Sequence, residues 1–389
     1  MLNQSIPLKS RIEAALEAAD SALVLASPSD ISRAAKAWRK CGTLGVDTEF
    51  VRERTYYAQL GLVQVSDGQT VWLIDPLVRG SHAPIKDLLE NEDIVKIFHS
   101  PSEDLDVLMN TVGAMPTPML DTQLACALLG QPLQLAYHAM VRWLFELDMD
   151  NDQTRSNWVS RPLKPAQLHY AALDVCLLPL IWEILQQRLK ELNRHSWLIE
   201  DCNAAVYNAG DQESTLSNWL RIRGVGRLDG ESLAILERLY NWREEQARAR
   251  DLPRGFIIKD PILLGIARLK PGDIGSLREV EGLHPGAVRR YGEDLLALIR
   301  SVRDSGKSLP IIQQLNRSER SCLAQMKSLV GDKARDLGVE PAVLASRREL
   351  EAIMRQDSNH WPPKFRGWRS ELIGKPLENL RQKFNPVTG

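Results

Sequence analysis

The sequence predicts an α/β domain followed by two small all-helical bundles. Strand-like segments rich in branched apolar residues occur in the first half of the chain, whereas strand signals nearly vanish after residue 210. The chain has 389 residues, 44% of them hydrophobic and 25% charged, which suits a soluble protein too long for one ordinary core. We therefore expect domains at 1–200, 210–303 and 304–389.

Strands and helices alternate in the expected α/β domain. The segments 42–50, 57–68 and 69–76 are separated by turn signals, which predicts three sequential strands in an antiparallel meander. Residues 94–100 should form a further strand, followed by a helix that opens near Ser102.

Three residues mark the later helices of this domain. Asp121 is a good N-cap for a helix that Gly130 stops. Pro165 suits the first position of a long helix, which Pro179 should kink or divide. These signals place the end of the α/β domain near residue 195.

Composition favours a cytoplasmic protein that does not enter a membrane. No apolar run approaches the roughly 18 residues of a membrane helix. The first 20 residues lack a signal peptide's apolar core and are typical of a short amphipathic helix. The five cysteines lack paired spacing, which predicts reduced and mostly buried thiols. No sustained heptad appears, so a monomer is expected.

Charge is distributed unevenly along the chain. Residues 1–200 hold 18 basic and 25 acidic residues, while 201–389 hold 31 and 25, and the basic excess lies in 301–389. An acidic half beside a basic half suits a metal-using catalytic domain next to a polyanion-binding region. Ordinary surface variation would produce the same imbalance.

Two pairs of acids are candidates for a metal site. Asp47 and Glu49 are two apart on a predicted strand and therefore share a face, where burying two like charges is costly unless a cation compensates. Exposed strand carboxylates are the alternative. Glu103 and Asp104 fall in the first turn of the helix after Ser102, and charge alone does not decide which of them faces a metal.

A fifth acid, Asp174, belongs to the long helix. Tyr170 precedes it by four residues, so the two side chains share a face about 40° apart, whereas His169 is rotated about 140° from Asp174. A phenol next to a metal-bound carboxylate can orient a nucleophilic water. We therefore favour Tyr170 over His169 as the catalytic partner of Asp174.

Asp47, Glu49, Asp104 and Asp174 together have a clear chemical use. Mg²⁺ and Mn²⁺ prefer oxygen ligands, and two such ions about 3.5–4 Å apart stabilise the attacking and leaving oxygens of phosphodiester hydrolysis. One ion would activate a water and the other would neutralise charge on the departing 3′-oxygen. The four carboxylates therefore predict a site for two divalent ions.

These residues lie in motifs that resemble the ribonuclease D family. The matching segments are DTEF at 47–50, TYYAQLGLVQ at 55–64, FHSPSEDL at 98–105 and RPL…HYAALDV at 161–175. This is the tyrosine subtype of the DEDD exonuclease superfamily, with a ribonuclease H-like fold. Residues 214–294 more weakly resemble an HRDC helical domain. Residues 304–389 show a similar succession of helices and gaps, which predicts a second HRDC-like bundle.

The resemblance implies roles for individual residues. Asp47, Glu49, Asp104 and Asp174 would be the metal ligands, and Glu103 a neighbouring acid that is not a primary ligand. The implied activity is a 3′→5′ exoribonuclease that releases nucleoside 5′-monophosphates and helps mature the 3′ ends of tRNA precursors. A DNA 3′→5′ exonuclease and a noncatalytic RNA-binding protein with a nuclease-like fold remain alternatives.

Two basic and aromatic groups in the helical half predict contact with nucleic acid. For any single arginine, an ordinary solvated position is the competing interpretation. The first group comprises Trp219, Arg221, Arg223 and Arg227, and the second Arg347, Arg348, Lys364, Arg366, Arg369, Trp361 and Trp368.

Overall fold

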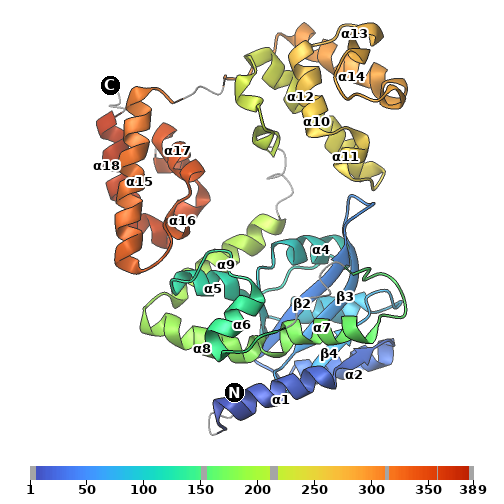
Figure 1. Ribbon diagram of the computed structural model, residues 1–389, viewed down its shortest axis with the longest axis vertical. Coiled ribbons are helices and arrows are strands. Elements are labelled where there is room, and N and C mark those ends of the chain that lie inside the picture. Colours follow the sequence, from blue (N-terminus) through green and yellow to red (C-terminus); the bar gives the residue numbers. More distant parts are fainter. Residues whose placement is uncertain (1–5, 150–155, 211–217, 312–314, 357, 385–389) are drawn as a thin grey trace. The chain divides into compact units, whose positions relative to one another are not determined.

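A computed structural model describes residues 6–149, 156–210, 218–311, 315–356 and 358–384 (Figure 1). Contacts divide the chain into two compact units. The first contains Met1–Val51, Gln59–Gly210 and Asn316–Gly389, and the second contains Arg52–Ala58 and Asp211–Leu315.

A six-stranded mixed sheet forms the centre of the first unit, in the order β1-β4-β3-β2-β5-β6. The central strands β2, β3 and β4 form the expected antiparallel meander, and the pairs β1–β4, β2–β5 and β5–β6 are parallel. The bounds are β1 (Leu23–Leu25), β2 (Thr43–Val51), β3 (Gln59–Ser66), β4 (Val71–Ile74), β5 (Val95–Phe98) and β6 (Met119–Asp121).

Helices cover both faces of this sheet. α7 (Pro165–Cys176) lies across β2, β3 and β4 on one face, in front of the strands in Figure 1, and α4 (Ser102–Val112) contacts β2 and β3. The others are α1 (Leu8–Asp20), α2 (Pro28–Trp38), α3 (His82–Leu89), α5 (Thr122–Leu128), α6 (Tyr137–Phe145), α8 (Leu178–Glu191) and α9 (His195–Gly210).

The expected helix boundaries are confirmed. Asp121 caps α5 by accepting a hydrogen bond from the Gln123 N–H, and Pro165 is the first residue of α7. The predicted break occurs at Leu177, immediately before Pro179 enters the first turn of α8. The stretch Pro165–Glu191 has the length and apolar character of a membrane span, but 61% of its most apolar window is buried in the protein. That burial is typical of a core helix.

The C-terminal helices pack against α9 within the first unit. The Arg369 guanidinium forms a bidentate ion pair with Asp201, at 2.5 and 2.8 Å, and the Trp368 ring stacks on Trp197 with centroids 4.4 Å apart. These helices are α15 (Arg317–Leu337), α16 (Pro341–Leu344), α17 (Arg347–Arg355), a π-helical turn (Ser370–Gly374) and α18 (Lys375–Phe384).

Burial changes the interpretation of the second basic and aromatic group. Trp361 and Trp368 are buried, Arg369 is held by Asp201, and Lys364 contacts Glu349. These four side chains contribute to the packing of the C-terminal helices, whereas Arg347, Arg348 and Arg366 are exposed. Contact of this group with nucleic acid stays a prediction, and it concerns the three exposed arginines. Sequence spacing gave the composition of the group but not which side chains turn inward.

The second unit is a helical domain with its own apolar core. Trp219 belongs to that core, whereas Arg221, Arg223 and Arg227 are exposed. The short segment Arg52–Ala58 joins this unit through Tyr56, whose hydroxyl donates to Glu244 at 3.1 Å. The helices are α10 (Gly230–Ala249), α11 (Arg254–Ile257), α12 (Asp260–Leu269), α13 (Ile274–Arg278) and α14 (Pro285–Ser305), preceded by a 3₁₀ turn (Val225–Arg227).

All five cysteines are free thiols. Four of them are buried and Cys41 is half-buried, as the scattered spacing predicted.

Candidate active site

Three of the predicted carboxylates meet between β2 and α7. Oxygen atoms of Asp47, Glu49 and Asp174 lie within 4.8 Å of one another. Asp47 and Glu49 alternate with Thr48 along β2, so they face α7 together. Gly45 permits the close approach of α7, because a Cβ there would lie 2.9 Å from the Val175 carbonyl oxygen. Backbone packing therefore brings two distant segments of sequence to one site.

Asp104 joins this cluster from the first turn of α4. Its side chain is buried and accepts a hydrogen bond from the Thr48 hydroxyl. Its charge acts on both Asp47 and Glu49, although it stands outside the tightest group of three. Glu103 is exposed. The structure thus distinguishes two adjacent acids that charge alone left equivalent.

Burial makes these carboxylates hard to ionise in the absence of a cation. Burial, together with the charges of Asp174 and Asp104, raises the pKa of Glu49 to about 9. Burial likewise raises the pKa of Asp174 to about 7 and that of Asp104 to about 6, against opposing hydrogen bonds from Tyr170 and Thr48. The pKa of Asp47 is raised by burial and by Asp104. A bound cation would reverse these directions by stabilising the ionised forms.

Tyr170 and His169, the two candidate partners of Asp174, differ in their contacts. Tyr170 hydrogen-bonds to the Asp174 carboxylate. His169 is exposed, and its Nδ1 lies 3.4 Å from Asp20. Helical geometry therefore predicted the correct neighbour of Asp174. The ring nitrogens of His99, which follows β5, form hydrogen bonds with the Thr122 hydroxyl and the Leu135 carbonyl, both at 2.9 Å.

A loop before α7 is fixed by Arg161, which the sequence reasoning did not assign. Its guanidinium donates to the Gly61 carbonyl, the Trp158 carbonyl and Asp75, at 2.7 to 2.8 Å. Trp158 in turn packs beside Tyr170, with ring centroids 6.2 Å apart. The loop therefore supports the side of the site that carries Tyr170. An arginine inside the RPL motif was the available signal.

The donor set fits a divalent metal of the magnesium type. Four carboxylates supply hard oxygen ligands, and no Lys or Arg appears among the groups that shift their pKa values. The buried amide of Gln64, directly opposite Asp47 on β3, has no hydrogen-bond partner for either Nε2 or Oε1 among the described residues. A bound cation would neutralise the carboxylates. The arrangement of side chains around that cation could then supply a partner for the Gln64 amide.

Comparison with known proteins places this geometry in a family. Residues 25–190 match the 3′-5′ exonuclease family, and residues 232–299 match the HRDC domain. Ribonuclease D of Pseudomonas paraeruginosa is 36% identical over 358 residues, covering 90% of this chain and 94% of the relative. The chain belongs to the ribonuclease D family.

Further relatives agree with this membership. Ribonuclease D of Escherichia coli K12 is 33% identical and covers 90% of the chain and 95% of the relative. The crystal structure of Escherichia coli RNase D superposes with a TM-score of 0.85, at 31% identity over 93% of this chain and 99% of that chain. The catalytic core of RRP6 from Trypanosoma brucei, 20% identical with a TM-score of 0.55, shares the fold.

Membership in the ribonuclease D family settles the class of enzyme. The chain is a metal-dependent 3′→5′ exoribonuclease, a hydrolase whose exonuclease domain precedes an HRDC domain and a helical C-terminal region. The predicted fold class is confirmed. The ribonuclease D relatives support RNA as the substrate.

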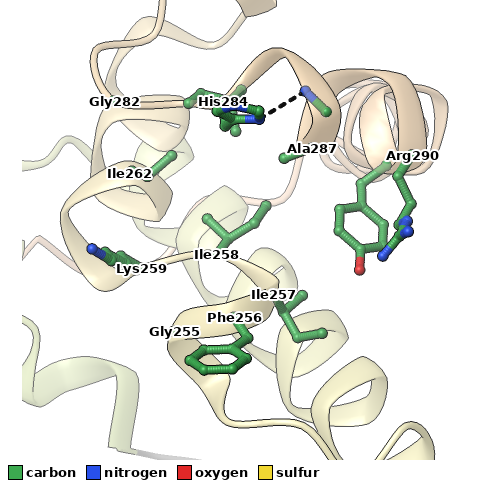
Figure 2. A pocket seen from close by; sticks show the side chains of 13 residues that line it. Gly255, Phe256, Ile257, Ile258, Lys259, Ile262, Gly282, His284, Ala287 and Arg290 are labelled. Atoms are coloured by element: carbon green, nitrogen blue, oxygen red, sulfur yellow. Dashed lines mark hydrogen bonds between the residues drawn. The ribbon is translucent and has the colours of Figure 1, made fainter.

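The HRDC domain carries a hollow that the sequence reasoning missed. A cavity of about 500 Å³ is lined by residues that include Phe256, Lys259, His284 and Arg290. Figure 2 shows the side chains that line it. The Phe256 side chain is 65% exposed, which is unusual for a phenylalanine. A second hollow shares Lys259 and adds Arg221.

Proposed function

We propose that this member of the ribonuclease D family hydrolyses RNA from the 3′ end with two divalent ions, Mg²⁺ or Mn²⁺, and releases nucleoside 5′-monophosphates. The meeting of Asp47, Glu49 and Asp174 within 4.8 Å, with Asp104 beside them, supports this proposal most directly. When bound, such ions stabilise charge on the attacking and leaving oxygens and make water a better nucleophile.

The protein's own groups would divide the remaining work. Asp47, Glu49, Asp104 and Asp174 would hold the ions. The Tyr170 hydroxyl, already hydrogen-bonded to Asp174, orients the attacking water in line with the scissile phosphate. Arg161 keeps the Trp158 loop against this tyrosine, and it is a positioning residue. A fixed hydroxyl limits the positions that the water can take.

We also infer that RNA binds the HRDC domain at the hollow of Phe256, Lys259 and Arg290. An exposed ring offers a surface on which any base can stack, and two cations beside it match a phosphate backbone. The exposed Arg221 extends this charge into the adjoining hollow. Such contacts would hold the strand while nucleotides are removed, without taking part in the chemistry.

The physiological substrates we propose are tRNA precursors and other structured RNA 3′ ends. The Escherichia coli relative is described as an exoribonuclease involved in structured RNA processing, which supports this class. We place the enzyme in the cytoplasm as a monomer, with domains at 1–200, 210–303 and 304–389. Free thiols suit a reducing compartment.

The test is cleavage of a 5′-labelled RNA and a matched DNA in Mg²⁺ or Mn²⁺, with and without chelator. We expect a ladder that shortens from the 3′ end of RNA and disappears with chelator or in Asp47→Ala. Faster digestion of DNA would favour the DNA-exonuclease alternative. Binding of RNA without cleavage in either metal would favour the noncatalytic one.

A further inference from the structure

The amide of Gln64 is the most unusual polar group near the proposed metal site. Its side chain is fully buried, yet neither Nε2 nor Oε1 has a hydrogen-bond partner among the described residues. Buried polar groups are nearly always paired, because leaving a donor or acceptor unmet costs the desolvation of that group. Two unmet atoms on one side chain therefore need an explanation.

Strand register places this amide beside the first carboxylate. Gln64 on β3 is directly opposite Asp47 on β2, so their side chains share a face of the sheet with Cβ atoms about 4.5–5.5 Å apart. That face is the one that α7 covers and on which Glu49 and Asp174 meet Asp47. A glutamine side chain is long enough to reach a carboxylate on the neighbouring strand.

The Asp47 carboxylate has more lone-pair positions than a metal ion would fill, and the remaining positions can accept hydrogen bonds. A carboxylate offers about four lone-pair positions, and a metal ion occupies one or two of them. The Thr48 backbone N–H donates to Asp47, and no other protein donor to it is found among the described residues. Ligating carboxylates are in turn hydrogen-bonded, and such partners fix their orientation.

We propose that Gln64 is a positioning residue whose Nε2–H donates to the Asp47 carboxylate and orients it for metal binding. This inference rests on the proposed function, since it assigns a role at the same site. A hydrogen bond to Asp47 would offset the cost of burying the amide donor, which has no other partner among the described residues. Gln64 touches neither substrate nor the reacting atoms.

The decisive variant is Gln64→Met, which keeps the length of the side chain and removes both unmet polar atoms. Calorimetric titration with Mn²⁺ alone should show an affinity about 10- to 100-fold weaker than in the wild type. The metal-free variant should melt at the same temperature as the wild type or higher, because the substitution removes two buried polar atoms that lack a partner. These opposite effects separate a positioning role from general damage to the fold.

Leu73→Met is the matched control. Leu73 lies opposite Gln64 on β4, is fully buried and shares the same face, but it is one strand further from Asp47. We expect Mn²⁺ affinity to be unchanged in this variant. Equal affinity in wild type and Gln64→Met would overturn the inference while leaving the metal site intact. Absence of Mn²⁺ binding by the wild type would overturn both.

A second measurement needs no variant. In a crystal structure of the wild type with Mn²⁺, the Gln64 Nε2 should lie within about 3.2 Å of an Asp47 oxygen. An amide that contacts only a buried water, with no bond to Asp47, would overturn the inference.

Discussion

The Tyr170 hydroxyl hydrogen-bonds to the Asp174 carboxylate one turn along α7, while the adjacent His169 turns outward to Asp20. Each residue along an α-helix is rotated by about 100° from the one before it. This rotation places the adjacent His169 and Tyr170, both candidates for a catalytic role, in different environments. The tyrosine lies at the carboxylate cluster, and the histidine lies at the surface.

Tyr170→Phe should lower kcat by about 10- to 100-fold and leave Mn²⁺ affinity nearly unchanged, because the hydroxyl orients water and supplies no metal ligand. Single-turnover cleavage of labelled RNA and calorimetric metal titration would measure the two effects. His169→Ala is the matched control and should cleave at the wild-type rate. A larger loss in His169→Ala than in Tyr170→Phe would contradict the assignment.

Asp174→Asn should reduce turnover by more than about 100-fold, since a metal ion contributes several kcal/mol of charge stabilisation and each 1.4 kcal/mol is about tenfold in rate. RNA binding, measured by fluorescence anisotropy in chelator, should persist because the HRDC hollow is unaltered. Glu103→Gln serves as the control, since Glu103 is exposed, and we expect it to retain activity. Comparable losses in both variants would count against the proposed ligand set.

Without metal, the free energy of unfolding should fall as pH rises from about 5 to 9. The folded-state pKa values of Asp104, Asp174 and Glu49 are raised to about 6, 7 and 9. The unfolded chain therefore loses these protons at lower pH than the folded protein does, so stability is highest when all three are protonated. Each carboxylate contributes a slope of at most about 1.4 kcal/mol per pH unit.

Urea unfolding in EDTA across this pH range would measure that slope, and saturating Mg²⁺ should flatten it. Asp174→Asn should show a smaller decline than the wild type, because one of the titrating carboxylates is gone. Stability that increases with pH in EDTA would be incompatible with acids whose pKa values are raised by burial.

Phe256→Ala and the double variant Lys259→Ala/Arg290→Ala should each weaken RNA binding without changing the metal site. Loss of one stacking surface is worth about 1–3 kcal/mol, or roughly 5- to 150-fold in affinity. The double variant should reduce the steepness of log affinity against log salt by about 1.4 to 1.8, because each lost phosphate contact removes about 0.7 to 0.9.

Lys307→Ala is the control for these RNA-binding variants, because Lys307 is a cation of the same unit that pairs with Glu237 at 2.6 Å. Its affinity and salt slope should match those of the wild type. Unchanged RNA affinity in Phe256→Ala and in the double variant would exclude the hollow as an RNA site.

Arg369→Ala should destabilise the protein by about 3–5 kcal/mol, because it leaves the Asp201 carboxylate without its buried partner. Arg347→Ala removes an exposed arginine that pairs with Glu351 and should change stability by less than about 1 kcal/mol. Chemical unfolding of both variants would measure the difference. Equal stabilities would show that the Arg369–Asp201 pair does not hold the C-terminal helices.

Local signals in the sequence predicted the main elements and the candidate residues of the site, although charge alone did not choose between Glu103 and Asp104. Alternating strands predicted the meander, Pro165 and Pro179 marked α7 and its end, and helical rotation selected Tyr170. These inferences succeed because they depend on the period of a strand or helix, which the chain carries within a few residues.

Only the tertiary structure decided contacts between distant segments. It turned Asp104 toward Thr48 and left Glu103 exposed, buried Trp361 and Trp368, and exposed Phe256 beside Lys259. It also placed Gln64 opposite Asp47, where its amide has no hydrogen-bond partner within the described part of the chain. Composition and spacing do not encode which face of an element is covered, because burial depends on segments that pack against it from elsewhere in the chain.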